Sequence, residues 1–133
     1  THVDKDSMFN TPPVFAIYTS MLTLRWLKKN GGIDWIEKLN QSKADLIYNE
    51  VDRNSLFTGT ANIEDRSNMN ATFDLTNQDF KTEFDQLLAE NNISGLKGHR
   101  SVGGYRASMY NALPLESVEV LVNSMKELEN KKG

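Results

Sequence analysis

An alternating stretch in the middle of the chain constrains its fold more than any other part of the sequence. Over residues 68–75 apolar and polar side chains alternate, and the apolar members are Met69, Ala71, Phe73 and Leu75. A period of two is typical of a β-strand with one buried and one polar face. A shorter extended piece is expected at residues 56–58. The chain must therefore form a sheet with one covered face, and other segments must supply the cover.

Helical patterns on either side of these strands can supply it. Helices are expected at residues 14–30, at 34–51, at 80–91 and from 114 onward. The first carries apolar residues on more than one stripe, so we expect it to be buried on several sides. The second keeps one apolar face, and Lys43 and Glu50 are expected mostly off that face.

Two further strands are expected between the third and fourth helices, one of them at residues 105–110. On that strand Tyr105, Ala107 and Met109 would share one side, whereas Arg106 would lie on the other. The order is then helix, helix, strand, strand, helix, strand, strand, helix. It predicts an α+β domain in which the helices pack on a short, mainly antiparallel sheet.

Length and composition restrict the class of protein. A chain of 133 residues fits a single domain with one core. Charged residues make up 25% of it, so no membrane span is expected, and the cytoplasm is the expected compartment. Cysteine is absent, which excludes disulfides, thiolate zinc sites and cysteine nucleophiles within this chain. The first residue is Thr1, from which we expect a processed chain or part of a longer one.

A basic segment, residues 97–108, interrupts this acidic chain. No acidic residue occurs between Glu90 and Glu116, although the net charge of the chain is -3. The segment reads KGHRSVGGYRAS, in which glycines allow backbone N–H groups to approach a ligand and arginines offer paired donors to phosphate or carboxylate. The pattern predicts an anion-binding site, and a basic surface loop is the alternative.

The sequence contains no pattern typical of a nucleotide-binding, hydrolytic, nucleic-acid-binding or metal site. The glycines of the basic segment match neither the P-loop nor the dinucleotide-binding motif. The many carboxylates fall on helix surfaces, and no nucleophile elbow accompanies the serines near His99. The pI of 5.4 and the lack of a basic stripe argue against nucleic acid. His2 has no second ligand at helical spacing, so no metal site is expected.

Four motifs, in order, resemble the C-terminal part of the phosphoserine aminotransferase family. They are NTPPVFAIY at 10–18, WLK at 26–28 with Gly31 and Gly32 after it, the basic segment, and YNALPLE at 110–116. The resemblance runs from residue 8 to residue 133. It implies the small C-terminal domain of a fold-type-I transferase that depends on pyridoxal 5'-phosphate. Residues 1–30 would then lead from the large domain, and residues 31–133 would form the small domain.

The resemblance also implies an activity. Enzymes of this family transfer an amino group between glutamate and 3-phosphohydroxypyruvate, giving phosphoserine and 2-oxoglutarate in serine biosynthesis, and they act as cytoplasmic homodimers. Their Schiff-base lysine belongs to the large domain. We therefore expect no catalytic residue in this chain, no activity from the chain alone and no stable binding of pyridoxal phosphate to it.

Five residues match binding positions of the family. Asn10 and Thr11 match the pair that reaches the cofactor phosphate of the neighbouring subunit. Arg106 matches the arginine that holds the substrate α-carboxylate, and His99 and Arg100 match the pair that meets its distal phosphate or side-chain carboxylate. Each also has a plainer alternative role: a helix cap for the first pair, an ion pair for Arg106 and a loop contact for His99.

Two other functions stay open. The domain could stand alone and bind a phosphorylated or carboxylated metabolite through the basic segment. An aminotransferase of altered specificity, acting on a phosphorylated hydroxythreonine, is the other. If a large domain belongs to this chain, the helix near residues 10–27 should carry bare apolar surface or cover it by self-association.

Overall fold

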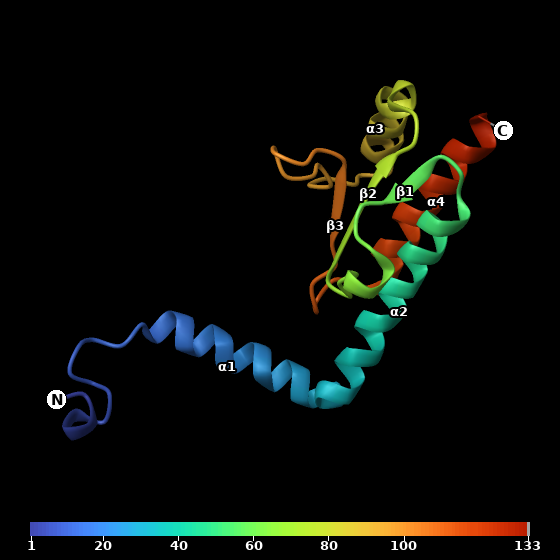
Figure 1. Ribbon diagram of the computed structural model, residues 1–133. Coiled ribbons are helices and arrows are strands. Elements are labelled where there is room, and N and C mark those ends of the chain that lie inside the picture. The colour runs from blue at the N-terminus through green and yellow to red at the C-terminus, as the bar shows by residue number, and fades with distance from the viewer. Residues whose placement is uncertain (133) are drawn as a thin grey trace. The chain divides into compact units, whose positions relative to one another are not determined.

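The computed structural model describes residues 1–132. They form two compact units, and the boundary between them in the sequence lies between Ile36 and Glu37. The first unit contains η1 (Val3–Lys5) and α1 (Val14–Lys29), and α2 (Gly32–Arg53) begins in it. The second contains the rest of α2 and every strand (Figure 1). The expected enzyme domains, 1–30 and 31–133, are not tested by this division and stay a prediction.

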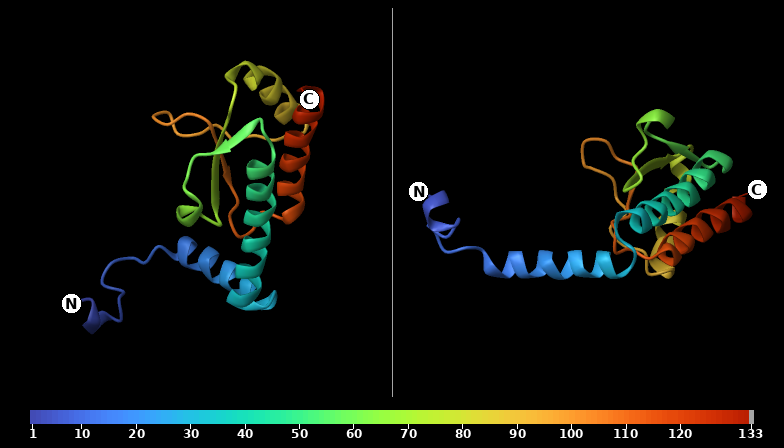
Figure 2. Two further views of the ribbon diagram at one scale, coloured as in Figure 1. Left: turned by 45° about the vertical axis from the view of Figure 1, so that its right-hand side comes forward. Right: turned by 90° about the horizontal axis from the view of Figure 1, so that it is seen from below.

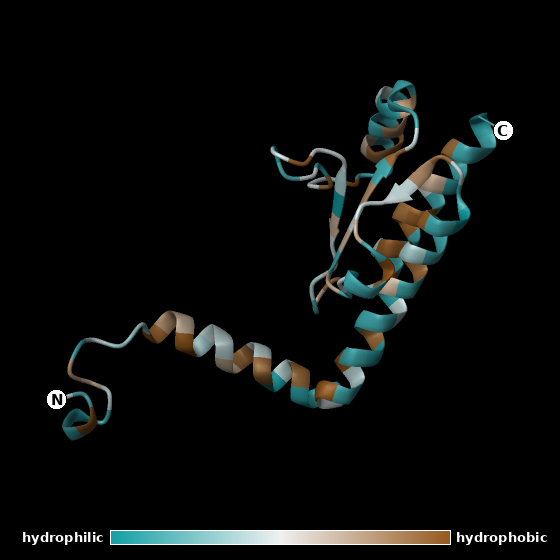
Figure 3. Cartoon of the chain, viewed as in Figure 1, coloured by the Kyte–Doolittle hydropathy of each residue, from teal (hydrophilic) through white to brown (hydrophobic). Residues whose placement is uncertain are grey.

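Helix α1 lies within one residue of its expected bounds, but two expectations about it are wrong. No side chain caps its first turn, and none of its residues is buried. Phe15 is 80% exposed and Leu24 64%. Its apolar residues therefore form bare surface, as expected for a helix that a large domain would cover, and Figure 3 shows them in brown along its length. At its end Gly31 and Gly32 take positive φ, which stops the helix.

The sheet of the second unit has three strands in the order β1-β2-β3: β1 (Phe57–Gly59), β2 (Asn70–Leu75) and β3 (Tyr105–Ser108). Both pairings are antiparallel, which confirms the expected sheet. The prediction of a fourth strand is wrong. Lys97 forms only an isolated bridge with Tyr105, because the chain turns back at once through Gly103 and Gly104.

Three helices cover one face of this sheet: α2, α3 (Lys81–Glu90) and α4 (Leu115–Lys132). Short turns η2 (Ile63–Asp65) and η3 (Gln78–Phe80) lie in the connections. In Figures 1 and 2 α2 and α4 run side by side, and Arg53 joins them through an ion pair of 2.8 Å with Glu129. None of the described helices combines the length and the hydropathy that a membrane crossing needs.

The core confirms the period-two pattern of the sequence. Along β2 every second residue is buried, and on β3 Tyr105 and Ala107 are buried whereas Arg106 is exposed. Aromatic rings pack edge-to-face at its centre, with 5.1 Å between the centroids of Phe84 and Tyr105. Helices α2, α3 and α4 supply the facing residues: Ala44, Ile47, Val51, Phe84, Leu87, Leu88, Val118, Leu121, Val122, Met125 and Leu128. The other face of the sheet stays open around Arg106.

The expected polar positions on α2 need correction, because Lys43 and Glu50 are buried. Lys43 lies four residues from both Leu39 and Ile47, so helical spacing places it within the apolar stripe. Its ammonium group donates to three backbone carbonyl groups of the segment that follows β3. Glu50 instead accepts a hydrogen bond of 2.9 Å from the side-chain amide of Asn54. The prediction relied on polar character alone and therefore placed both residues wrongly, off the buried face of the helix.

Candidate functional site

The basic loop, residues 97–104, leaves the edge of β3 and returns to it through a closed turn. At its base the N–H of Gly98 donates to the carbonyl of Gly104 at 2.9 Å, and at its tip the N–H of Gly103 donates to the carbonyl of His99 at 2.8 Å. A Cβ on Gly98 would collide with the carbonyl oxygen of Gly103. Two of the glycine N–H groups are thus used within the loop, so these glycines shape it and do not offer those donors to a ligand.

Arg106 lies in the middle of β3, opposite Thr72 of β2, on the open face of the sheet. Its guanidinium forms no ion pair with any carboxylate of residues 1–132. The alternative role as a structural ion pair is therefore not seen in the described part of the chain. An exposed guanidinium on a rigid strand is suited to a planar anion that supplies the missing partner.

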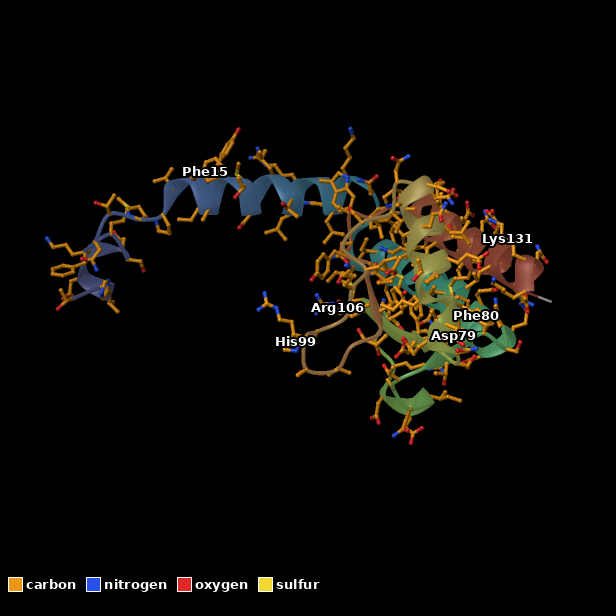
Figure 4. The ribbon with its side chains drawn as sticks, turned by 90° about the horizontal axis from the view of Figure 1, so that it is seen from above. Phe15, Asp79, Phe80, His99, Arg106 and Lys131 are labelled. Carbon is orange, nitrogen blue, oxygen red and sulfur yellow. The ribbon has the colours of Figure 1, made fainter. Side chains whose placement is uncertain are left out.

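His99 and Arg106 line the same hollow, which has a volume of about 200 Å³. Residues of the loop and of the sheet region line it: Thr60, Thr72, Gly98, Val102, Gly103 and Tyr105, together with these two. Figure 4 shows Arg106 and the loop that carries His99 on the same side of the unit. Arg100 is exposed next to His99 but does not line the hollow. The fold thus brings two of the three expected substrate residues to one place.

The strand that carries Arg106 is anchored from its buried side. The hydroxyl of Tyr105 donates to a carboxylate oxygen of Asp85 at 2.8 Å and accepts from Lys81 at 3.2 Å. Burial, and then the hydrogen bond to Asp85, raises the pKa of Tyr105 well above its usual value, so the hydroxyl stays protonated. The neighbouring Arg106 therefore projects from backbone that these contacts hold in register.

Asn10 and Thr11 belong to the first unit, in an irregular segment before α1. Both side chains are exposed and form no hydrogen bond within residues 1–132. The alternative role as helix cap is wrong, since the residue at the cap position is Pro13 and no side-chain cap is present. An amide and a hydroxyl without partners leave this pair suited to a ligand or subunit outside the chain.

Lys43 is one of the buried polar residues whose position the sequence interpretation missed. It is completely buried, and its Nζ donates to the carbonyl oxygens of Met109, Tyr110 and Leu113 at 2.9–3.2 Å. Burial lowers its pKa. With all three N–H donors engaged and no exposed surface, this amine is closed to a substrate. Its position in the apolar stripe was the signal in the sequence that could have revealed it.

The described residues offer no metal centre, because no group of three or more histidine and carboxylate side chains comes together within residues 1–132. The candidate site is therefore a small cationic hollow beside an open sheet face. Such a site can bind and orient an anion, and among the side chains that line it none is an activated nucleophile.

Comparisons with known proteins agree on one family. The family described as "Aminotransferase class-V" matches residues 1–121. A phosphoserine aminotransferase of Flavobacterium psychrophilum is 69% identical over 130 residues, which is 98% of this chain and 36% of that protein. The one of Porphyromonas gingivalis is 52% identical over 132 residues, with shares of 98% and 37%.

The comparison with solved structures also finds phosphoserine aminotransferases. A phosphoserine aminotransferase from Bacillus circulans subsp. alkalophilus superposes with a TM-score of 0.91 at 41% identity, over 100% of this chain and 37% of that one. The PLP-bound phosphoserine aminotransferase from Trichomonas vaginalis reaches 0.83 at 38% identity, over 94% and 36%. The chain thus spans little more than a third of the length of the relatives it matches.

Proposed function

Since this chain belongs to the class-V aminotransferase family, we propose that it forms the C-terminal part of a phosphoserine aminotransferase. The high identity to relatives of that name supports this assignment, and the coverage of about 36% of their length agrees with a part of the enzyme. The whole protein would transfer an amino group between glutamate and 3-phosphohydroxypyruvate in serine biosynthesis. A cytoplasmic homodimer is the state in which we expect it to act.

The single observation that carries the role of this chain is the hollow shared by His99 and Arg106. Arg106 would pair its two guanidinium donors with the α-carboxylate and so fix the orientation of the substrate. His99, with Arg100 beside it, would bind the distal phosphate of phosphoserine. Glutamate carries a carboxylate at the corresponding end, and the same cationic pair would accept it. One site would thereby serve both amino-group donors.

Asn10 and Thr11 would contact the cofactor. Their unpartnered amide and hydroxyl fit a phosphate group, which accepts several hydrogen bonds, and they precede a helix whose first turn lacks a side-chain cap. Pyridoxal phosphate, when bound to the whole enzyme, supplies the electron sink for amino-group transfer. The residues of this chain would bind and orient the substrate and the cofactor phosphate. Lys43, whose amine is buried and fully hydrogen-bonded, is not available as a nucleophile.

Steady-state kinetics of the full-length enzyme test this proposal. Arg106→Ala should lower kcat/KM about 100-fold for phosphoserine and for glutamate alike, because both lose the anchor of the α-carboxylate. Arg53→Lys is the matched control, since Arg53 pairs with Glu50 and Glu129 on the helical side of the unit. It should leave both values unchanged. Unaltered kinetics in Arg106→Ala would contradict the assigned role.

A stand-alone binding domain remains the second candidate, and one observation favours it. All the residues that line the hollow belong to the second unit. Titration calorimetry of residues 1–133 with phosphoserine separates the two candidates. Tight binding that Arg106→Ala abolishes would favour the binding domain, whereas binding only by the full-length protein favours the enzyme.

A further inference from the structure

The imidazole of His99 is held by the residue two positions later. Its Nδ1 lies 2.8 Å from the hydroxyl oxygen of Ser101 and 3.3 Å from the backbone nitrogen of the same residue. A backbone N–H only donates hydrogen bonds, so Nδ1 must be the acceptor and carries no proton. In a neutral ring the proton then resides on Nε2. The two contacts together select one tautomer of His99.

The backbone around this ring is fixed as well. The carbonyl of His99 accepts hydrogen bonds from the N–H groups of Val102 and Gly103, at 3.0 and 2.8 Å. The ring therefore cannot rotate away without breaking the contacts to Ser101 or opening the turn. Nε2 has no hydrogen-bond partner within residues 1–132, and His99 lines the hollow that also contains Arg106. The unused donor of the ring thus belongs to a residue of the candidate anion site.

Tautomer choice matters because the expected ligand groups are acceptors. A phosphate dianion or a carboxylate presents only lone pairs, so a neutral imidazole helps to bind it only through an N–H group. The opposite tautomer would turn a lone pair of Nε2 toward the anion and repel it. An unrestrained neutral histidine populates both forms, which would weaken its contribution to binding.

On the basis of the proposed function, we infer that Ser101 is a positioning residue. It holds His99 as the Nε2–H tautomer, so that the neutral ring donates a hydrogen bond to the distal phosphate or side-chain carboxylate of the substrate. Ser101 acts through His99 and supplies no group to the reaction. The hydroxyl and the backbone N–H of one residue would thereby set the anion affinity of its neighbour.

A double-mutant cycle in the full-length enzyme tests the inference. Ser101→Ala should raise KM for phosphoserine about 3- to 10-fold with kcat unchanged, the effect of weakening one hydrogen bond to a charged group. Ser101→Thr keeps the hydroxyl and should restore the KM. In His99→Gln the side-chain amide donates from nearly the same position and has no tautomer to choose. Ser101→Ala should therefore add no further increase in that background.

Ring 15N NMR spectra supply an independent readout. The His99 signals, identified by their loss in His99→Gln, should show a protonated Nε2 and a bare Nδ1 in the wild type at a pH where the ring is neutral. Ser101→Ala removes the shorter contact, of the hydroxyl at 2.8 Å, and keeps the backbone N–H at 3.3 Å, so it should shift both signals part of the way toward a mixture of tautomers. A purely structural role of Ser101 would leave the tautomer unchanged and would raise KM equally in both backgrounds, and either result overturns the inference. If His99→Ala leaves KM for phosphoserine unchanged, the proposed role of His99 fails, and this inference fails with it.

Discussion

The Nζ atom of Lys43 lies 2.9 Å from the carbonyl oxygen of Tyr110, although 67 positions separate the two residues in the sequence. Two more carbonyl oxygens of the segment between β3 and α4 accept from the same ammonium group. One helical turn earlier, Asn40 donates its amide to the side chain of Asn111 at 2.8 Å. Helix α2 thereby fixes the chain just beyond the strand that carries Arg106.

Replacing Lys43 by methionine should lower the free energy of unfolding by about 2–3 kcal/mol, because three buried carbonyl groups lose their donor. The methionine fills most of the volume, so the cost is chiefly that of the unpaired oxygens. Lys38→Met, at an exposed position of the same helix, is the control and should change stability by less than about 0.5 kcal/mol. Urea denaturation followed by circular dichroism compares the two. Equal stability of both variants would contradict the anchoring role.

Gly98→Ala should open the basic loop, because the added Cβ would collide with the carbonyl oxygen of Gly103. We expect KM for phosphoserine in the full-length enzyme to rise about 10-fold or more, as His99 leaves its position opposite Arg106. Gly95→Ala is the control: it strains a positive φ of 77° but meets open space, so it should leave KM unchanged. A normal KM in Gly98→Ala would mean that the loop tolerates the change or that its closure is not needed for binding.

The ion pair between Asp52 and Arg66 should make stability depend on acid pH. Two hydrogen bonds from Arg66, of 2.6 and 2.7 Å, hold the pKa of Asp52 below its ordinary value of 3.8. Because the pKa is lower in the folded state, the stabilisation is present above about pH 4 and is lost as the pH falls through the folded pKa. The pair is partly exposed, so the effect is modest.

The measurement compares urea midpoints of the wild type and Asp52→Asn from pH 7 down to about pH 3. The variant should be less stable at pH 7, and the difference between the two midpoints should become smaller as the pH falls below about 4. Glu119→Gln, at an exposed position of α4, is the control, and its difference from the wild type should stay small at both pH values. A difference between wild type and Asp52→Asn that does not become smaller as the pH falls would show that the carboxylate charge is not responsible.

The bare apolar surface of α1 should cause residues 1–133, studied alone, to associate with increasing concentration. Phe15 and Leu24 are well exposed on this helix, and burial of such side chains against a second molecule is favourable by about 25 cal/mol per Å². Sedimentation measurements should show weaker association for Phe15→Gln combined with Leu24→Gln. Ile63→Gln, which removes an exposed side chain from the other unit, should have no such effect. A wild-type chain that stays monomeric at high concentration would contradict the prediction.

Local patterns were sufficient to predict most of the fold. The alternation of Ala71, Phe73 and Leu75 identified the buried face of β2, and the helical stripes identified the residues that cover it. These predictions succeeded because burial on a strand or helix depends on spacing along the chain. The second strand expected between the third and fourth helices did not form, because strand pairing also needs an adjacent partner over several residues, and Lys97 makes only an isolated bridge with Tyr105.

Residue types and their order in the sequence determined the protein family, the basic segment and the identity of the anion-binding candidates. Only the tertiary structure decided which of them meet. His99 and Arg106 share a hollow because the turn at Gly103 brings the loop back over the open face of the sheet. Lys43 became an anchor because a distant loop presents its carbonyl groups to an apolar helix face. Contacts of this kind depend on the registry of segments far apart in the chain, which no local period encodes.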